Sequence, residues 1–178
     1  MTHNHAGLLL DMGLGKTVVT LTVLHRLLYD EFALNKALVI APKRVAEDTW
    51  SREAEKWDHL SDLRVVKVLG SAKQREAALR QDGDVYVINR ENVVWLVETL
   101  GSHWPFDGIV IDELSSFKSS RSKRWRALRR VVGCANYVYG LTGTPAPGGY
   151  IDLWPEMYLL DRGQRLGRTL GEYRNTYF

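Results

Sequence analysis

Cysteine is almost absent from this chain, which has a single cysteine, Cys134, among its 178 residues. One cysteine excludes an internal disulfide framework and fits a reducing compartment, and we expect it to be a buried packing residue. A basic leader followed by a long apolar run is also lacking, and no stretch reaches the roughly 18 apolar residues that a membrane helix needs. The sequence therefore predicts a cytoplasmic protein with no membrane partner.

A strong excess of one charge is lacking as well. The formal net charge is +3 and the sequence pI is about 9.0, which leans toward polyanionic partners without excluding others. Hydrophobic residues make up 45% and charged residues 25% of the chain, an ordinary composition for one globular domain of this length.

Short apolar runs rich in β-branched residues alternate with segments in which apolar residues recur at helical spacing. The runs predict strands at residues 6–11, 36–41, 63–69, 84–89 and 107–112, with a sixth at 136–142. The helical segments are residues 17–29, 44–57, 72–79, 93–100 and 125–132. This alternation is typical of crossover units that feed a parallel sheet. It predicts an α/β fold with a mostly parallel central sheet flanked by helices.

The segment DMGLGKT follows the first predicted strand and precedes a helix, the context of a phosphate-binding loop. Gly13 and Gly15 allow a tight turn whose amides cradle phosphates, the Lys16 ammonium reaches the β- and γ-phosphates, and the Thr17 hydroxyl is a ligand for Mg²⁺. The predicted ATP contacts are Met12, Gly13, Leu14, Gly15, Lys16, Thr17 and Val18. The full GxxxxGK[ST] pattern is not met, because Leu10 occupies the place of the first glycine. The alternative is a glycine-rich turn with a solvated lysine.

The fifth predicted strand ends in two carboxylates, Asp112 and Glu113, at the edge where parallel sheets bind ligands. Asp112 suits Mg²⁺, held through water, and Glu113 suits a general base that polarises the attacking water. In isolation, two solvated acids in a surface turn would explain the same residues. The phosphate loop about a hundred residues upstream favours the catalytic interpretation, with Lys16, Asp112 and Glu113 as the catalytic set.

Two further segments carry clustered basic side chains. Lys43 and Arg44 begin a helix directly after a strand, which suits contact with a phosphate backbone, although a solvated helix start is the alternative. The run RSKRWRALRR is interpreted as the solvated face of a helix anchored by apolar residues, with a DNA-facing stripe as the alternative. The tryptophans are spaced like core or helix anchors and form no ladder for stacking bases.

These motifs together resemble the nucleic-acid motors of helicase superfamily two, within it the Swi/Snf-like branch, and most of all its short phage and bacterial members. DMGLGKT is similar to motif I, VIAPKRVAEDTW to motif Ia, IDELSSFKS to motif II and LTGTPAPGG to motif III, and the tail DLWPEMYLLDRGQRLGRTLGEYRNTYF is similar too. Motif II departs from the family at Leu114 and Ser115, where DEAH or DEAD is usual. Motif III has Ala146 where asparagine often follows the proline.

The resemblance implies a three-layer RecA-like P-loop NTPase domain spanning residues 1–178, the first of two lobes of an ATP-dependent DNA translocase in a bacterial or phage-infected cell. Asn89 and Arg90 fall near motif Ib and join Lys43 and Arg44 as expected nucleic-acid contacts. Thr142, Gly143 and Thr144 would couple the nucleotide state to the second lobe. The expected partners are duplex DNA, contacted through its backbone, and a second RecA-like lobe in cis or in trans.

Motifs IV to VI, with the family's arginine fingers, do not occur in this sequence. The chain alone is therefore expected to bind ATP better than it hydrolyses it, since such a finger contributes about 10³- to 10⁵-fold in rate. The missing motifs indicate that the chain is a fragment of a longer motor. The alternative is a small protein that borrows a second lobe from a partner. A P-loop kinase would need an arginine-rich lid, which does not follow the loop. The remaining alternative is a non-catalytic module that binds nucleotide or DNA and acts through a partner.

Overall fold

A computed structural model of the chain describes residues 4–9 and 15–178. It contains one sheet of six strands within these residues. The strands are β1 (His5–Leu9), β2 (Ala37–Ala41), β3 (Val65–Val68), β4 (Val85–Asn89), β5 (Gly108–Asp112) and β6 (Tyr137–Thr142). Their order across the sheet is β1-β6-β5-β2-β4-β3, and every pairing between them is parallel. The predicted α/β fold is confirmed, with a described sheet that is parallel throughout.

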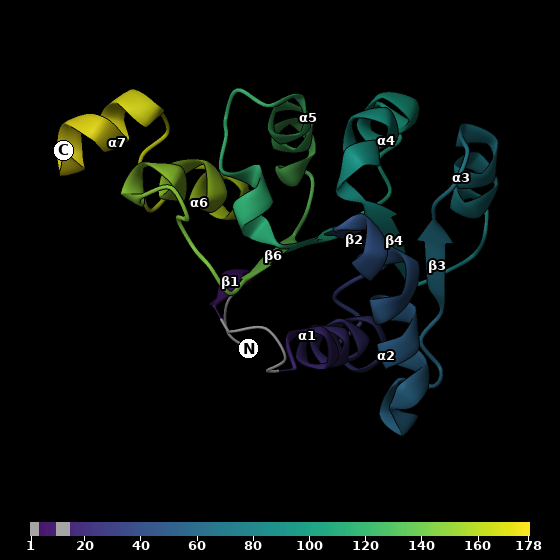
Figure 1. Cartoon of the computed structure of the whole chain (residues 1–178). Helices are drawn as coiled ribbons and strands as arrows, with labels where there is room; N and C mark the ends of the chain where they lie inside the picture. Colours follow the sequence, from purple (N-terminus) through teal and green to yellow (C-terminus); the bar gives the residue numbers. More distant parts are fainter. Residues whose placement is uncertain (1–3, 10–14) are drawn as a thin grey trace.

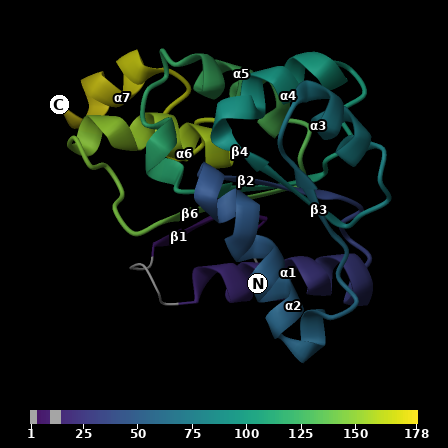
Figure 2. The ribbon, with the colours of Figure 1, turned by 45° about the vertical axis from the view of Figure 1, so that its right-hand side comes forward.

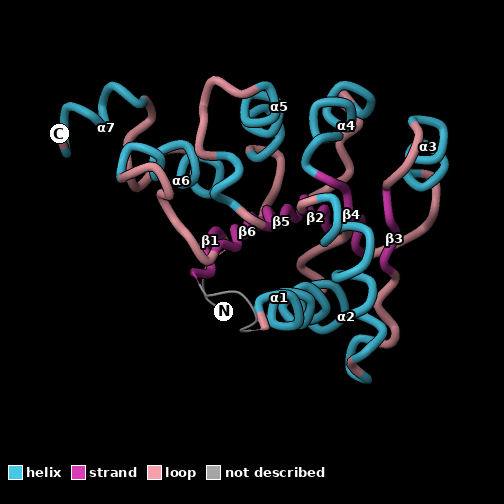
Figure 3. Tube along the Cα trace, in the orientation of Figure 1, coloured by secondary structure: helices cyan, strands magenta, loops and turns pink. Residues whose placement is uncertain are grey.

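Helices cover both faces of this sheet (Figures 1 and 2). The helices are α1 (Lys16–His25), α2 (Trp50–Lys56), α3 (Ala72–Leu79), α4 (Val93–Leu100), α5 (Lys123–Val132), α6 (Leu153–Asp161) and α7 (Leu170–Tyr177). Helices α1 and α2 lie on one face and α3 to α6 on the other, with α7 beside α6 (Figure 3). A π-helical segment extends α1 over Arg26–Asp30, and another, Val45–Thr49, leads into α2.

Alternation of side chains along the strands produces two cores. Leu38 and Ile40 of β2 belong to the core beneath α3 to α6, whereas Val39 between them belongs to the core beneath α1 and α2. The same period of two separates Ile109 and Ile111 from Val110 in β5. Because both faces are covered, β2 is apolar throughout and β5 is apolar up to its last residue, Asp112, as their sequence indicated.

Several expectations differ from the structure in detail. The predicted strands 36–41, 84–89, 107–112 and 136–142 each begin one residue too early, and the prediction 63–69 extends beyond β3 at both ends. Strand β1 begins one residue before its predicted start, and predicted residues 10 and 11 lie outside the described residues. Helix α5 begins two residues earlier than predicted because the Ser122 side chain caps it by accepting the Trp125 N–H at 3.2 Å. Helices α6 and α7 were not predicted. Cys134 is exposed, so its expected burial was wrong; it lies in the turn between α5 and β6, beyond the buried face of the helix. No helix of the described residues is long and apolar enough to cross a membrane.

Candidate nucleotide site and nucleic-acid face

The carboxyl ends of the strands bring the sequence-predicted residues to one edge of the sheet. Leu9 of β1 pairs with Thr142 of β6, and Asp112 of β5 pairs with Leu141. On the other side of β5, strand β2 ends beside Asn89 of β4. The end of β1, the acidic pair and the motif III segment are therefore neighbours, and the candidate nucleic-acid residues follow along the same edge.

The start of helix α1 offers an anion site. Gly15 caps the helix in the left-handed conformation, with φ of 78°, and Lys16 is its first residue. The first N–H groups of a helix have no partner within it, and the helix dipole adds partial positive charge there. Lys16, Thr17 and Val18 are half-buried at this end. Met12, Gly13 and Leu14 lie outside the described residues, so their predicted contacts stay predictions.

Asp112 points toward the helix layer that carries Lys16. It follows Val110 at the period of two, and Val110 belongs to the core beneath α1 and α2. The Trp50 indole N–H, at the start of α2, donates to Asp112 Oδ2 at 3.0 Å, with both side chains buried. Sequence reasoning missed this role of Trp50, because it treated tryptophans as core anchors.

The electrostatics of Asp112 connect the two halves of the site. Burial raises the pKa of Asp112, and the charge of Glu113 acts in the same direction. The Trp50 hydrogen bond and the Lys16 ammonium lower the pKa, but the net shift is upward. Because burial disfavours the ionised form of this carboxyl, a cation placed beside it would stabilise that form. Lys16 thus acts on Asp112 although almost a hundred residues separate them.

Glu113 has a strained backbone. Its φ is 57° and its ψ is 62°, the left-handed conformation that residues with a side chain seldom adopt. The conformation turns the chain sharply between β5 and the short helical turn Leu114–Phe117, whose Leu114 and Phe117 are buried. Strain of this kind costs about 1–3 kcal/mol and is concentrated at functional sites. The half-buried Glu113 is thereby held at the strand end beside Asp112.

The donor set at this edge fits Mg²⁺ bound together with a polyphosphate. No group of three or more His, Cys, Asp or Glu side chains that could hold a metal occurs within residues 4–9 and 15–178. Mg²⁺ is usually held by one or two carboxylates, with the remaining oxygens coming from water and phosphate. One carboxylate, Asp112, and one hydroxyl, Thr17, match that pattern.

The motif III segment leaves β6 and is held by hydrogen bonds. Thr142 is fully buried, and its Oγ1 accepts the Thr144 N–H at 3.2 Å, while Thr144 itself is exposed. The Ala146 N–H faces the carboxyl of Glu156 in α6, which is 1% exposed. Burial raises the pKa of Glu156 to about 7, Asp152 adds to the rise, and Ala146 and Lys118 oppose it. Nothing in the sequence pattern marked Glu156.

Lys43 and Arg44 lie where the sequence placed them. Both are exposed and helical directly after β2, and the Pro42 carbonyl accepts the Ala46 N–H at 2.9 Å as the helix begins. Neither forms an ion pair within the described part of the chain. Two uncompensated cations at a helix start form a surface suited to phosphate.

Asn89 and Arg90 are tied into their own turn. The Asn89 amide donates to Glu91 at 3.0 Å and accepts from Asn92 at 2.7 Å, so its hydrogen bonds organise the turn after β4. Arg90 Nε lies 3.5 Å from the Glu91 carboxylate, and the side chain is 30% exposed. Contact with nucleic acid stays a prediction for both residues, and Arg90 is the more accessible of the two.

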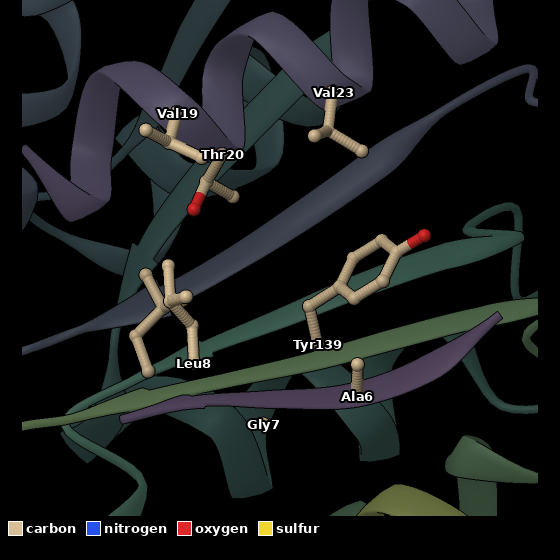
Figure 4. A pocket seen from close by; sticks show the side chains of 8 residues that line it. Ala6, Gly7, Leu8, Val19, Thr20, Val23 and Tyr139 are labelled. Atoms are coloured by element: carbon tan, nitrogen blue, oxygen red, sulfur yellow. The ribbon is translucent and has the colours of Figure 1, made fainter. Parts of the chain in front are cut away.

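A small apolar hollow lies between α1 and the edge of the sheet (Figure 4). Its volume is about 50 Å³, and it is lined by Ala6, Gly7, Leu8, Val19, Thr20, Val23, Tyr139 and Leu141. The Thr20 hydroxyl is already used, since it donates to the Lys16 carbonyl at 2.6 Å. A hollow so small and apolar does not suit a nucleotide. The candidate site is instead the open end of the strands.

Comparison with known proteins places this arrangement in a family. The sequence profile of the SNF2-related domain matches residues 1–164. Protein p41 of Acyrthosiphon pisum secondary endosymbiont phage 1 is 43% identical over 173 residues, which is 94% of this chain and 38% of that protein. Helicase ssl-1 of Caenorhabditis elegans is 29% identical over 166 residues, which is 88% of this chain and 7% of the helicase.

A solved structure shows the same fold. The Sulfolobus solfataricus SWI2/SNF2 ATPase core in complex with dsDNA superposes with a TM-score of 0.80 and 26% sequence identity, over 98% of this chain and 34% of that one. The chain thus spans little more than a third of the phage protein and of the solved core. The predicted resemblance and the RecA-like fold class are confirmed.

Proposed function

The chain belongs to the SNF2-related domain family, and from this premise and the geometry of its site we propose that it is the ATP-binding lobe of an ATP-dependent DNA translocase. The observation that carries the proposal is the placement of Lys16, the first residue of α1, in the helix layer that buried Asp112 faces and from which Trp50 donates to it. A phosphate-loop lysine and a strand-end carboxylate brought together in this way are the two halves of a site for Mg²⁺ and a nucleoside triphosphate.

In the proposed binding mode, the N–H groups at the start of α1 and the Lys16 ammonium hold the β- and γ-phosphates. Thr17 and Asp112 would hold Mg²⁺, with Asp112 acting through water, and the ion would supply charge neutralisation at the phosphate oxygens. Trp50 keeps Asp112 in place by donating to Oδ2. A hydrogen bond of this kind to a metal ligand orients the ligand and adjusts its basicity.

Hydrolysis in this proposal depends on Glu113. The carboxylate orients a water in line with the γ-phosphate and accepts its proton as the oxygen attacks phosphorus and the bond to the β-phosphate oxygen breaks. The left-handed backbone at Glu113 supports this role, because it fixes the direction of the side chain beside Asp112. Thr142, Gly143 and Thr144 would pass the state of the site to a second lobe.

Three observations support DNA as the partner. The solved relative was captured with dsDNA, Lys43 and Arg44 are exposed and unpaired in the described chain, and no exposed aromatic ladder for stacking bases is found in its described part. We propose contact with the phosphate backbone of a duplex, with strong salt dependence and little sequence preference.

The second lobe is also proposed. The matched relatives are much longer than this chain, and arginine fingers would come from that lobe. ATP turnover by this chain alone is expected to be slow and to rise by about 10³- to 10⁵-fold when the lobe is supplied in cis. The alternative is a non-catalytic module that binds nucleotide or DNA and acts through a partner.

Isothermal titration of ATP and Mg²⁺ into the chain tests the site, with Lys16→Ala and Glu113→Gln as variants. Binding by the wild type and by Glu113→Gln, with loss in Lys16→Ala, is the expected result. Absence of binding at millimolar ATP by a folded wild type would overturn the nucleotide site. Binding without turnover after the second lobe is supplied would favour the non-catalytic alternative.

A further inference from the structure

Positive charge is concentrated in the last third of the chain. Residues 114–178 contain eleven Lys and Arg against four Asp and Glu, whereas residues 1–113 contain thirteen against seventeen. No acidic residue occurs between Glu113 and Asp152, a stretch with seven basic residues. Nine of the eleven cations are arginines, whose planar guanidinium groups bind phosphate in pairs of hydrogen bonds. The net charge of +3 therefore conceals a basic region.

Helix α5 presents much of this charge on one face. Trp125, Leu128 and Val132 are buried, as the sequence predicted. Lys123, Arg126 and Arg130 are exposed and follow each other by three and four residues, so they form one stripe along the helix, here called the α5 stripe. Its length is about 10 Å, close to the rise of three base pairs in a duplex.

The α5 stripe holds cations that the helix itself does not require. The helix dipole disfavours Lys123 in the first turn and favours Arg130 in the last turn, while Arg126 and Arg130 are like charges four residues apart. Within the described residues, no carboxylate forms an ion pair with any of the three. A face needed only for solubility would tolerate acids in these positions equally well. Partners outside the fold explain the bias better.

The stripe begins near the candidate nucleic-acid face. Arg124, next to Lys123 in α5, is one of the charges that act on Glu91, in the turn that also holds Arg90. Helix α5 also packs against α4, the helix that follows this turn. Positive charge therefore continues from the carboxyl edge of the sheet along α5.

The other end of the stripe leads to a concave basic surface. A hollow of about 780 Å³ is lined by Arg129, Tyr158, Asp161, Arg162, Gly163, Gln164, Arg168 and Thr169. The Arg129 guanidinium lies 5.2 Å from the ring centre of Tyr158 and 5.6 Å from that of Trp125, which restrains it. Asp161 does not neutralise the hollow, because it is one carboxylate against three arginines in this lining and it also pairs with Arg165, Oδ2 to Nη1, at 3.7 Å.

We propose that the α5 stripe, with Arg129, Arg162 and Arg168 in the adjoining hollow, is a second binding surface for the phosphate backbone of duplex DNA. It extends the contacts of Lys43 and Arg44 and rests on the proposed function for the choice of DNA as the polyanion. The contacts are to phosphate and carry no sequence preference.

The test compares two variants with equal loss of charge. The stripe variant combines Lys123→Gln, Arg126→Gln and Arg130→Gln. The control combines Lys56→Gln in α2, Lys73→Gln in α3 and Arg80→Gln at the C-cap of α3, three exposed cations. Binding of a labelled duplex is measured by fluorescence anisotropy at several salt concentrations. The stripe variant should bind about tenfold more weakly at low salt and lose about 2–3 from the slope of log K against log salt. The control should change neither by more than a small fraction.

Thermal unfolding separates binding from folding. Removing the like charges should leave the stripe variant as stable as the wild type or more stable, whereas a structural role would lower its stability. Equal losses in the two variants, or a wild type that does not bind duplex at low salt, would overturn the proposal. Competition by polyglutamate as strong as that by DNA would overturn the choice of nucleic acid.

The outcome is distinguishable from that of the proposed function. Lys16→Ala should lose ATP binding and keep the stripe contribution, because the stripe does not touch the nucleotide site. If Lys43→Gln with Arg44→Gln weakens DNA binding and the stripe variant does not, the second surface fails while the translocase proposal stands. If ATP binding fails and the stripe effect persists, the reverse holds.

Discussion

Carboxylates at the two ends of the central sheet differ in how fully their oxygens are hydrogen-bonded. At the amino-terminal end, Asp107 accepts the backbone N–H groups of Asn35 and Lys36, and Asp84 accepts the Tyr29 hydroxyl at 2.5 Å and the Arg64 N–H at 2.9 Å. At the carboxyl end, Asp112 accepts a side-chain hydrogen bond from Trp50, and Glu156 Oε1 is buried without a hydrogen-bond partner in the described chain.

We call the amino-terminal end of the sheet, with Asp84 and Asp107, the structural edge, and the carboxyl end, with Asp112, Glu113 and Glu156, the working edge. Burial alone would raise the pKa of Asp84, but its hydrogen bonds with Arg64 and Tyr29 outweigh that and hold the pKa below the ordinary value. Asp112 and Glu156 have raised pKa values instead, because burial wins. Saturated carboxylates stabilise a fold, whereas under-satisfied ones leave capacity for a ligand or a proton.

The largest expected effect comes from removing the base at the working edge. Glu113→Gln should lower DNA-stimulated ATP turnover by about 10²- to 10⁴-fold, since the amide cannot accept the proton of the attacking water. Turnover is measured by phosphate release with the second lobe supplied in cis. Asp107→Asn, at the opposite end of the same strand, should leave the rate unchanged. A comparable fall in both would remove the distinction between the two ends.

At the structural edge, Asp84→Asn should lower the free energy of unfolding by about 2 kcal/mol at neutral pH, because charged hydrogen bonds from Arg64 and Tyr29 are weakened. The depressed pKa means that Asp84 stabilises the wild type above about pH 4 and loses this effect at lower pH. Urea unfolding at pH 7 and pH 3 should therefore show a difference that shrinks in acid.

Asp82→Asn is the matched control, since Asp82 also pairs with Arg64 but is 82% exposed in its side chain. Its loss should cost well under 1 kcal/mol. A variant at Asp84 that is no less stable than the one at Asp82 would contradict the structural role of the network.

Glu156→Gln should change how stability varies with pH. The folded pKa of about 7 lies above the ordinary 4.5, so the wild type loses stability as pH rises between these values, by about 1–3 kcal/mol in total. The variant, with a neutral side chain, should be the more stable of the two at pH 8. Chemical unfolding across pH 4–8 measures this, and Glu98→Gln, an exposed change on α4, should leave the profile intact. Parallel profiles for wild type and Glu156→Gln would sink the prediction.

The smallest effect is expected for Trp50→Phe, which removes the donor to Asp112 and keeps the aromatic packing. Affinity for ATP with Mg²⁺ should fall a few-fold, in line with about 1 kcal/mol for one hydrogen bond. Trp125→Phe removes an equivalent donor, to the Pro155 carbonyl at 2.9 Å, away from the site. Calorimetry that finds the same loss in both would deny Trp50 its positioning role.

The sequence predicted the sheet and its working edge, because each pattern involved lies within a few consecutive residues. The carboxylates Asp112 and Glu113 follow an apolar run directly, and Lys16 follows a glycine-rich turn. The structural edge was not predicted, since Tyr29 and Asp84 are 55 residues apart and no pattern in one announces the other. The Trp50 and Glu156 roles were hidden for the same reason.

Some local features depend on a single residue and cannot be seen in the periodic pattern of apolar residues. Gly140 lies in β6 where any side chain would collide with Leu114 and Leu160, so its small size is a packing need that apolar counting does not reveal. Helix α6 was not predicted; Pro155 lies in its first turn, where a proline leaves no required N–H unpaired.

The pairing of β1 with β6 has a consequence for biosynthesis. His5 lies beside Val138, about 130 residues later in the chain. The entropy cost of closing so long a loop makes this pairing slow to form. Of the six described strands, β1 is synthesised first and β6 last. At about 5–20 residues per second, the interval between them lasts several seconds or more. The proposed nucleotide site therefore stays incomplete in a nascent chain until β6 emerges, and nucleotide binding would report that β1 has paired with β6.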